Sequence, residues 1–195
     1  MIKKKIHLVV GGRPNYIKSF NLIRVLKKKK FKIILILTNQ HYDHELNQIF
    51  FDELKINRPD IVLKNKGSNV ENIKQKYQKV LDYNRPELVV VFGDMNSALG
   101  AALAAKNKRV PIAHVESGLR SFDKRMPEEK NRIAIDKISS LLFCTTQSAL
   151  KNLNKENVKG KRFFVGNSMI DTLKILKSKI INRKFYNCLL YTSDA

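Results

Sequence analysis

The feature that most constrains the fold of this sequence is a regular alternation of short apolar runs with longer, helix-like segments. The apolar runs are mostly β-branched and nearly continuous, which is typical of strands in a parallel sheet covered on both faces. They lie at residues 5–10, 32–37, 61–63, 88–92, 110–115, 141–144 and 163–165. The segments between them have helical spacing or strong helix formers, at residues 16–30, 46–54, 70–83, 98–105, 128–138, 147–153 and 170–181. The alternation predicts an α/β fold with a Rossmann-like, doubly wound parallel sheet.

Length and composition limit the class of protein. A chain of 195 residues with 43% hydrophobic content can form one domain with a core, or one domain and the start of another. The apolar runs are shorter than the roughly 18 residues of a membrane span, and the basic start lacks a secretory cleavage pattern. We therefore expect a cytoplasmic protein without a membrane partner. The two cysteines, Cys144 and Cys188, lie too far apart in sequence to indicate a disulfide framework or a zinc cage.

The net charge of +21 has two interpretations. A strongly basic surface is typical of nucleic-acid binding. The lysines, however, are spread along the whole chain together with many Asn and Ile, which favours a general compositional bias. We expect no nucleic-acid partner, and a basic groove for a phosphate-bearing small molecule fits either interpretation.

The loops after the strands are the places to look for a site, because ligands of such sheets bind beyond the carboxyl ends of the strands. The first strand is followed by Gly11, Gly12, Arg13 and Lys18. Two glycines allow a ligand to approach the backbone, the next helix presents its positive N-terminus, and the two cations add charge. The alternative is a tight turn with solvated cations. The spacing matches neither a dinucleotide fingerprint nor a phosphate-binding P-loop.

The loop after the second strand, residues 38–44, is rich in polar side chains. His41, Asp43 and His44 are poorly spaced for a catalytic zinc site, so we expect no metal. A polar loop that shapes a pocket is the better interpretation, with Gln40 and His41 as candidates for substrate contact.

Three carboxylates follow neighbouring strands and are the candidate acid–base groups. Asp94 follows the strand at residues 88–92, and Glu116 and Glu128 follow the next one. Proton removal and return on opposite faces of a substrate require two such groups. The alternatives are that Asp94 only caps the next helix and that Glu128 is an ordinary first-turn helix charge.

Arg120 lies in the same charged stretch as Glu116 and Glu128, residues 114–132, and is a further candidate for substrate contact. Asn167 follows the last strand and is another. Its alternative role is to cap the helix that comes next.

Six ordered motifs together resemble the N-terminal half of the non-hydrolysing UDP-N-acetylglucosamine 2-epimerase family. They are Gly-Gly-Arg-Pro-Asn-Tyr-Ile-Lys (11–18), Thr-Asn-Gln-His-Tyr-Asp (38–43), Phe-Gly-Asp-Met-Asn-Ser (92–97), His-Val-Glu-Ser-Gly-Leu-Arg (114–120), Met-Pro-Glu-Glu-Lys-Asn-Arg (126–132) and Gly-Asn-Ser-Met-Ile-Asp (166–171). The sequence departs from the family at Gly12, Asn39, Met95 and Ser117, and none of these departures removes a charged group. Residues 121–129 further resemble a branch that acts on modified UDP-sugars such as diacetamido-uronic acids.

The resemblance implies the first half of a GT-B-like fold, in which two Rossmann-type domains enclose the active site. Residues 1–175 would form the N-terminal domain, and residues 176–195 the start of an interdomain helix and a tail. The C-terminal domain, which in the family holds most of the nucleotide and a catalytic histidine, is absent from this sequence. From about residue 187 the tail is either non-native sequence from a truncated reading frame or an ordinary frayed terminus.

The resemblance also implies a chemistry: C2 of a UDP-N-acetylhexosamine is inverted by elimination of UDP to a glycal and re-addition. Asp94, Glu116 and Glu128 would be the acid–base and electrostatic groups, and Arg13 and Lys18 would position sugar or diphosphate. The reaction needs no metal or nicotinamide cofactor. The expected role is in cell-surface polysaccharide precursor synthesis, with a full-length homodimer and a fragment inactive alone. The alternative is a hydrolysing relative that releases UDP and N-acetylmannosamine.

Overall fold

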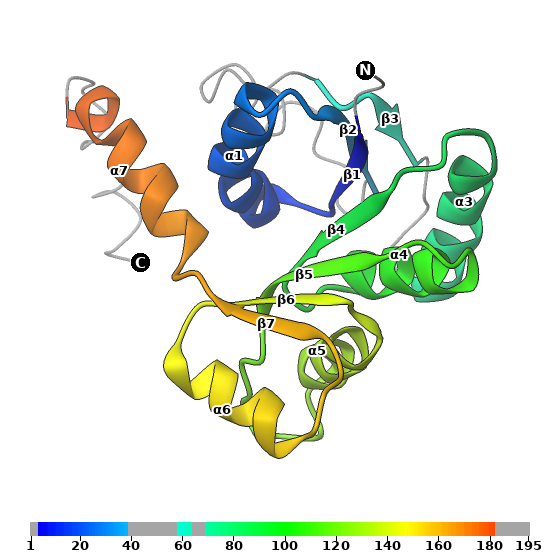
Figure 1. The fold of residues 1–195 in the computed structure, drawn as a ribbon, viewed down its shortest axis with the longest axis vertical. Coiled ribbons are helices and arrows are strands. Elements are labelled where there is room, and N and C mark those ends of the chain that lie inside the picture. The colour runs from blue at the N-terminus through cyan, green and yellow to red at the C-terminus, as the bar shows by residue number, and fades with distance from the viewer. Residues whose placement is uncertain (1–3, 39–57, 64–68, 182–195) are drawn as a thin grey trace, which may run out of the picture.

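Seven parallel strands form one sheet in the order β3-β2-β1-β4-β5-β6-β7 in the computed structural model, which describes residues 4–38, 58–63 and 69–181 (Figure 1). The strands are β1 Lys5–Val10, β2 Lys32–Leu37, β3 Ile61–Val62, β4 Leu88–Phe92, β5 Ile112–Ser117, β6 Leu141–Cys144 and β7 Lys161–Phe164. The predicted Rossmann-like parallel sheet is confirmed. Strand order reverses between β1 and β4, and the crevice beyond such a reversal is where these sheets bind ligands.

The helices of the described residues fall where helical spacing predicts them. They are α1 Arg13–Lys28, α3 Val70–Tyr83, α4 Asn96–Asn107, α5 Pro127–Ile138, α6 Gln147–Lys155 and α7 Ser168–Ile181. Several begin with recognisable local chemistry: Asn69 and Thr146 cap α3 and α6 with their side chains, and Pro127 starts α5. The helix predicted for residues 46–54 lies outside the described residues. Helix α7 continues across the expected domain boundary at 175/176, and that division stays a prediction.

Alternate residues of the strands point to two apolar layers. Leu8 and Val10 of β1 pack with α1, whereas Val9 joins the layer formed by α3 and α4. Helix α4 is rich in alanine, and at Gly100 an added Cβ would lie 2.9 Å from the Ile73 side chain. The small residues of α4 therefore bring α3 and α4 into close contact, which is tighter packing than bulkier side chains would allow.

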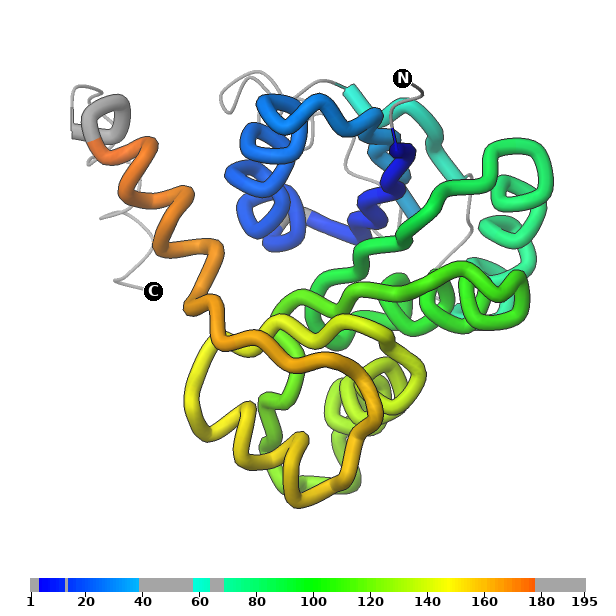
Figure 2. The backbone as a smooth tube through the Cα atoms, in the orientation of Figure 1, coloured from blue at the N-terminus to red at the C-terminus, as the bar shows by residue number. Residues whose placement is uncertain are grey.

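Helix α7 returns from β7 to the face of the sheet that α1 covers. The Thr172 hydroxyl donates a hydrogen bond to the carbonyl of Ile17, at 2.8 Å. Figure 2 shows the chain leaving β7 and running back beside α1. The last described helix is thus attached to the first one.

Strand β5 corrects one predicted boundary. The apolar run at 110–115 predicts a strand that ends before Glu116, but the strand spans Ile112–Ser117. Pro111 has no N–H for a ladder bond, which removes the first residues from the strand. At the other end the pairing with β6 shifts register between Val115 and Ser117. Glu116 therefore lies within a bulged strand and not in the following loop.

A buried histidine in β1 predicts a pH dependence of stability. His7 is fully buried, and burial, with a smaller contribution from the charge of Lys5, lowers its pKa from 6.5 to about 4. Between these values the unfolded chain binds a proton at His7 and the folded chain does not. We therefore expect the free energy of unfolding to fall as the pH is lowered from 6.5 to about 4, by up to about 3 kcal/mol.

Urea unfolding at several pH values measures this effect, with His7→Asn as the comparison. The variant lacks the titrating group, so its free energy of unfolding should change less than that of the wild type across the same pH window. If the free energy of unfolding changes equally with pH in the two proteins, His7 does not cause the acid sensitivity.

Candidate active site

The loop after β1 leads directly into helix α1 at the switch point of the sheet. The N-cap of α1 is Gly12, in an extended conformation, and no side chain caps this end. No acidic residue occupies the first turn either. Backbone N–H groups at such an end attract anions such as phosphate. Arg13 is the first residue of α1, and its side chain lies outside the described part of the structure.

Lys18 of α1 and Glu116 of β5 form an ion pair beside the end of β4. The two side chains are 14% and 16% exposed, so the pair is mostly shielded from water. Gly93, which follows β4 with a φ of +65°, lies directly against it. A Cβ at Gly93 would be 3.3 Å from Glu116 Oε2 and 3.6 Å from Lys18 Nζ. The glycine therefore provides both the backbone conformation and the space that the ion pair needs.

The backbone of Glu116 is in the left-handed region, with a φ of 71°. A residue with a side chain seldom adopts this conformation, which costs about 1–3 kcal/mol and persists only where the surroundings impose it. The register shift in β5 is at the same place. Bulges of this kind re-aim a side chain, and here the side chain that turns toward Lys18 is the predicted catalytic carboxylate.

Asp94 forms the second ion pair of the site, with Arg132 of α5. It does not cap α4, because the N-cap of that helix is Met95 and no side chain bonds there. Asn131 supports the same loop: its amide donates to the Asp94 carbonyl at 2.9 Å and to Asn96 Oδ1 at 2.8 Å. Helix α5 thus holds the loop that carries Asp94.

Glu128 and Glu129 occupy the first turn of α5 but have different surroundings. Glu128 is exposed, and lies one helical turn before Arg132 on the same side of the helix. Glu129 is buried, and its carboxylate accepts hydrogen bonds from the backbone N–H groups of Ser121 and Phe122, at 3.0 and 3.1 Å. Glu129 therefore shapes the loop before α5, whereas Glu128 remains accessible to a ligand.

Arg120 is buried among protein partners. Its guanidinium contacts Asp136 at 2.8 Å and makes two hydrogen bonds of 2.7 Å to Glu156. Burial alone would lower the pKa of Arg120, but Glu156 and Asp136 outweigh burial and raise that pKa. A substrate contact by Arg120 stays a prediction, and it would require these ion pairs to break.

The remaining predicted contacts are Asn167, Gln40 and His41. The Asn167 side chain accepts a hydrogen bond from the N–H of Met169 at 2.9 Å, which supports the start of α7. Its role toward a substrate stays a prediction. Gln40 and His41 lie outside the described residues.

The sequence interpretation missed three side chains of α5 that organise the site: Asn131, Arg132 and Asp136. Asn131 and Arg132 belong to the Met-Pro-Glu-Glu-Lys-Asn-Arg motif but carry no signal of their own. A signal was present in the spacing, because Glu128, Arg132 and Asp136 follow each other at intervals of four residues on a helix that begins at Pro127. That spacing places all three on one side of the helix.

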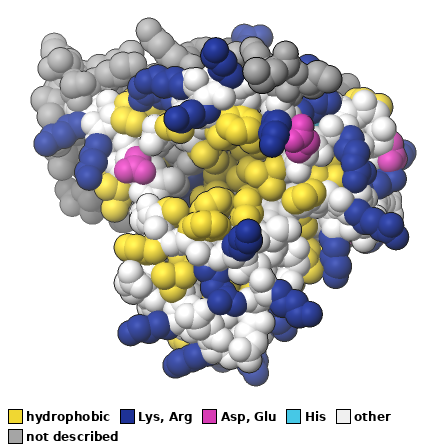
Figure 3. Space-filling model, viewed as in Figure 1, with side chains coloured by type: hydrophobic (Ala, Val, Ile, Leu, Met, Phe, Trp, Pro, Cys, Tyr) yellow, Lys and Arg dark blue, Asp and Glu magenta, His cyan; other side chains and the backbone are white. Residues whose placement is uncertain are grey.

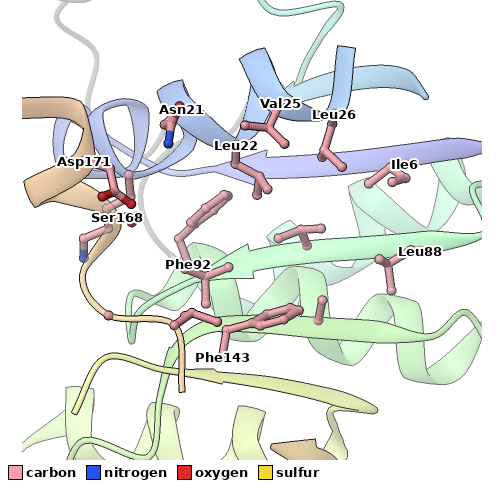
Figure 4. A pocket seen from close by; sticks show the side chains of 16 residues that line it. Ile6, Asn21, Leu22, Val25, Leu26, Leu88, Phe92, Phe143, Ser168 and Asp171 are labelled. Carbon is pink, nitrogen blue, oxygen red and sulfur yellow. The ribbon is translucent and has the colours of Figure 1, made fainter. Parts of the chain in front are cut away.

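A cavity of about 320 Å³ lies beside the site, between α1, the start of α7 and the sheet. Its wall is mainly apolar, with Phe92 and Phe143 facing Leu22 and Leu26, and Figure 4 shows Asn21, Ser168 and Asp171 gathered at one end. Figure 3 shows the same hollow as hydrophobic surface with Lys and Arg side chains around it. Lys18 borders both the cavity and the ion pair. An apolar wall does not suit a diphosphate, so the two ion pairs and the start of α1 are the better candidates for the polar site.

Two features of the described residues limit the other kinds of site. No group of three His, Cys, Asp or Glu side chains there is placed to hold a metal ion. No helix in the same ranges is both long and apolar enough to cross a membrane.

Comparison with known proteins identifies related sequences. A family model described as UDP-N-acetylglucosamine 2-epimerase matches residues 24–190. The UDP-N-acetylglucosamine 2-epimerase of Methanocaldococcus jannaschii is 39% identical over 97% of this chain and 54% of its own length. The UDP-2,3-diacetamido-2,3-dideoxy-D-glucuronate 2-epimerase of Pseudomonas aeruginosa is 40% identical over 80% of this chain and 46% of its own length. The chain therefore spans about half the length of these curated relatives.

Solved structures give the same result for the fold. The M. jannaschii UDP-GlcNAc 2-epimerase in complex with UDP-GlcNAc and UDP matches with a TM-score of 0.89 and 36% identity, over 96% of this chain and 53% of that one. The Neisseria meningitidis UDP-GlcNAc 2-epimerase bound to UDP-GlcNAc matches with a TM-score of 0.85 and 28% identity, over 94% of this chain and 51% of that one. Because these are GT-B-type structures, the predicted half of a GT-B-like fold is confirmed.

Proposed function

Because this chain belongs to the UDP-N-acetylglucosamine 2-epimerase family, we propose that it is the N-terminal part of an enzyme that inverts C2 of a UDP-N-acetylhexosamine. The reaction would convert UDP-GlcNAc to UDP-ManNAc. The solved relatives that contain UDP-GlcNAc support a UDP-sugar as the substrate class. The second half of the crevice, and with it full activity, would come from polypeptide beyond these residues.

The chemistry requires elimination, because no carbonyl next to C2 makes its proton acidic. A carboxylate takes the C2 proton, the C1–O bond breaks, and UDP leaves with the bonding electrons. A C1=C2 double bond forms and gives a glycal. A proton is then delivered to the opposite face of C2 while an oxygen of UDP attacks C1, so the sum of the two steps is an isomerisation. Such a route needs two acid–base groups and cations near the departing diphosphate.

The observation that carries this proposal is the presence of two ion pairs at the switch point, Lys18–Glu116 and Arg132–Asp94. Glu116 and Asp94 are the acid–base candidates, and each contacts a cation, Lys18 or Arg132. Glu128 is an accessible third carboxylate one turn from Arg132. Lys18 and Arg132 can exchange a carboxylate for the charged groups of a substrate, and the uncapped start of α1 can receive an oxyanion.

The relatives support two candidate sugars equally well. One relative is named for UDP-N-acetylglucosamine and another, of nearly the same identity, for a diacetamido-glucuronate sugar. Both substrates carry an acetamido group at C2, so the same carboxylates would serve either one. A carboxylate on the sugar would need a further cation, for which Lys124 and Arg125 in the loop before α5 are exposed.

The test is the reaction of UDP-GlcNAc in heavy water, catalysed by the polypeptide that contains this chain. We expect UDP-ManNAc with deuterium at C2 and no accumulation of UDP, measured by NMR and chromatography. UDP and free N-acetylmannosamine released in step with turnover would instead support the hydrolysing alternative. If neither sugar changes and neither substrate class binds, the proposal is wrong. A role in polysaccharide precursor synthesis and a homodimer are further parts of the proposal.

A further inference from the structure

His114 of β5 lies between two hydrogen-bond acceptors in the interior of the protein. Its Nδ1 is 2.7 Å from Asp136 Oδ1, its Nε2 is 2.8 Å from the carbonyl oxygen of Gly93, and the side chain is fully buried. A carbonyl oxygen only accepts, so Nε2 carries a proton. Nδ1 faces the carboxylate of Asp136, so both ring nitrogens have a hydrogen-bond partner.

Asp136 uses its other oxygen as well. Its Oδ2 is 2.8 Å from the Arg120 guanidinium and accepts the backbone N–H of Gly118 at 3.1 Å. With Glu156, which pairs with Arg120, the cluster brings together His114, Arg120 and two carboxylates.

This cluster encloses the strained residue of the site. His114 and Gly118 flank Glu116 at equal distances along the chain, and both bond to Asp136. Between them the backbone of Glu116 has its positive φ and β5 has its register shift. Strained backbone persists only where the surrounding structure fixes it. Asp136 fixes both sides of Glu116, and it does so from the helix whose Arg132 contacts Asp94.

The His114 ring also reaches the second carboxylate loop. Its Nε2–H bonds the carbonyl of Gly93, the residue before Asp94 and the one against the Lys18–Glu116 ion pair. We propose that Asp136 and His114 act together as positioning residues, which hold Glu116 and the Asp94 loop in their working arrangement. The structural half of this inference stands alone, and its catalytic half rests on the proposed epimerase function.

The structural half is tested by backbone amide NMR of the 195-residue chain, comparing Asp136→Asn with Ile135→Val. Asp136 contacts the His114 ring and accepts the N–H of Gly118. We therefore expect Asp136→Asn to move the amide signals of Gly118 and Glu116, and the signal of Gly93 through the His114 ring. Signals at these residues that move no more than in Ile135→Val would overturn the structural half.

The positioning role is tested by the kinetics of Asp136→Asn in the polypeptide that contains this chain. A carboxylate displaced by about 1 Å costs on the order of 100-fold in rate, so we expect kcat to fall roughly 10- to 100-fold with KM nearly unchanged. Ile135→Val is the control, because it loosens the neighbouring buried position of α5 without touching the cluster. An unchanged kcat in Asp136→Asn, in an active enzyme, would contradict the positioning role. An inactive wild type would count against the epimerase function, and the NMR result would still decide the structural half.

Discussion

Replacing Glu116 by Gln will lower kcat for C2 epimerisation by about 100- to 10,000-fold, the usual contribution of a positioned acid–base group. Gln keeps the size of the side chain but neither accepts a proton at neutral pH nor pairs with Lys18. Asp94→Asn should have an effect of similar size, because Asp94 is the second carboxylate of the site. KM should change much less than kcat in both variants if the lost interaction is made mainly in the transition state. The measurement is steady-state kinetics of the polypeptide that contains this chain.

The matched control is Glu71→Gln, which removes another glutamate that pairs with a lysine. Glu71 lies on the exposed surface of α3 and contacts Lys74 at 2.7 Å. We expect its kcat to stay within about twofold of the wild type, since exposed ion pairs contribute little to stability and Glu71 is away from the crevice. If Glu116→Gln and Asp94→Asn both retain wild-type kcat, neither carboxylate is an acid–base group and the proposed mechanism fails.

Gly118→Ala will be strongly destabilising because two separate effects add. The φ of Gly118 is +75°, and left-handed backbone costs a residue with a side chain about 1–2 kcal/mol. In addition, the new Cβ would lie 2.5 Å from the Ala149 carbonyl oxygen and 2.9 Å from Leu153 Cγ, so α6 would have to move. Overpacking of this kind costs about 1–3 kcal/mol. We expect the free energy of unfolding to fall by about 2–5 kcal/mol.

Gly166→Ala separates the two effects. Gly166 has the same φ of +75°, but nothing lies within 4 Å of the position where its Cβ would be. This variant should therefore show only the backbone cost, about 1–2 kcal/mol. Urea unfolding of both variants measures the difference. Equal losses in the two proteins would mean that α6 moves away from the new methyl group at no cost, contrary to the close contact of Gly118 with Ala149 and Leu153.

The fold was predictable from sequence because strands and helices leave local patterns. The strands β1, β2, β4 and β6 have the predicted bounds, since their apolar runs end at glycine or at polar residues. The start of β5 was not predicted correctly, because the apolar run continues through Pro111, which cannot donate to the ladder. The bulge at its end depends on a partner strand, and no local pattern reports it.

The residue types of the candidate site were predictable from the sequence, but the ion-pair partner of each carboxylate was not. The sequence places Glu116 and Asp94 after neighbouring strands, so their convergence at one edge follows from the topology. It does not indicate that Lys18 pairs with Glu116, 98 residues away, or that Arg132 pairs with Asp94. Those contacts depend on how α1 and α5 pack against the sheet. The same is true of Arg120, whose charge suggested a ligand but whose neighbours Asp136 and Glu156 bury it.

The position of β1 between β2 and β4 has a consequence for how the site forms during folding. Strands β1 and β2 lie close in sequence, separated by a single helix, whereas β1 and β4 are far apart along the chain. Pairings distant in sequence form slowly, since loop closure costs entropy before any contact repays it. The Lys18–Glu116 pair spans this junction and exists only in a chain that has completed it. A ligand bound across that pair would favour the finished topology over every partly folded form, and so act as a selective stabiliser of correctly assembled molecules.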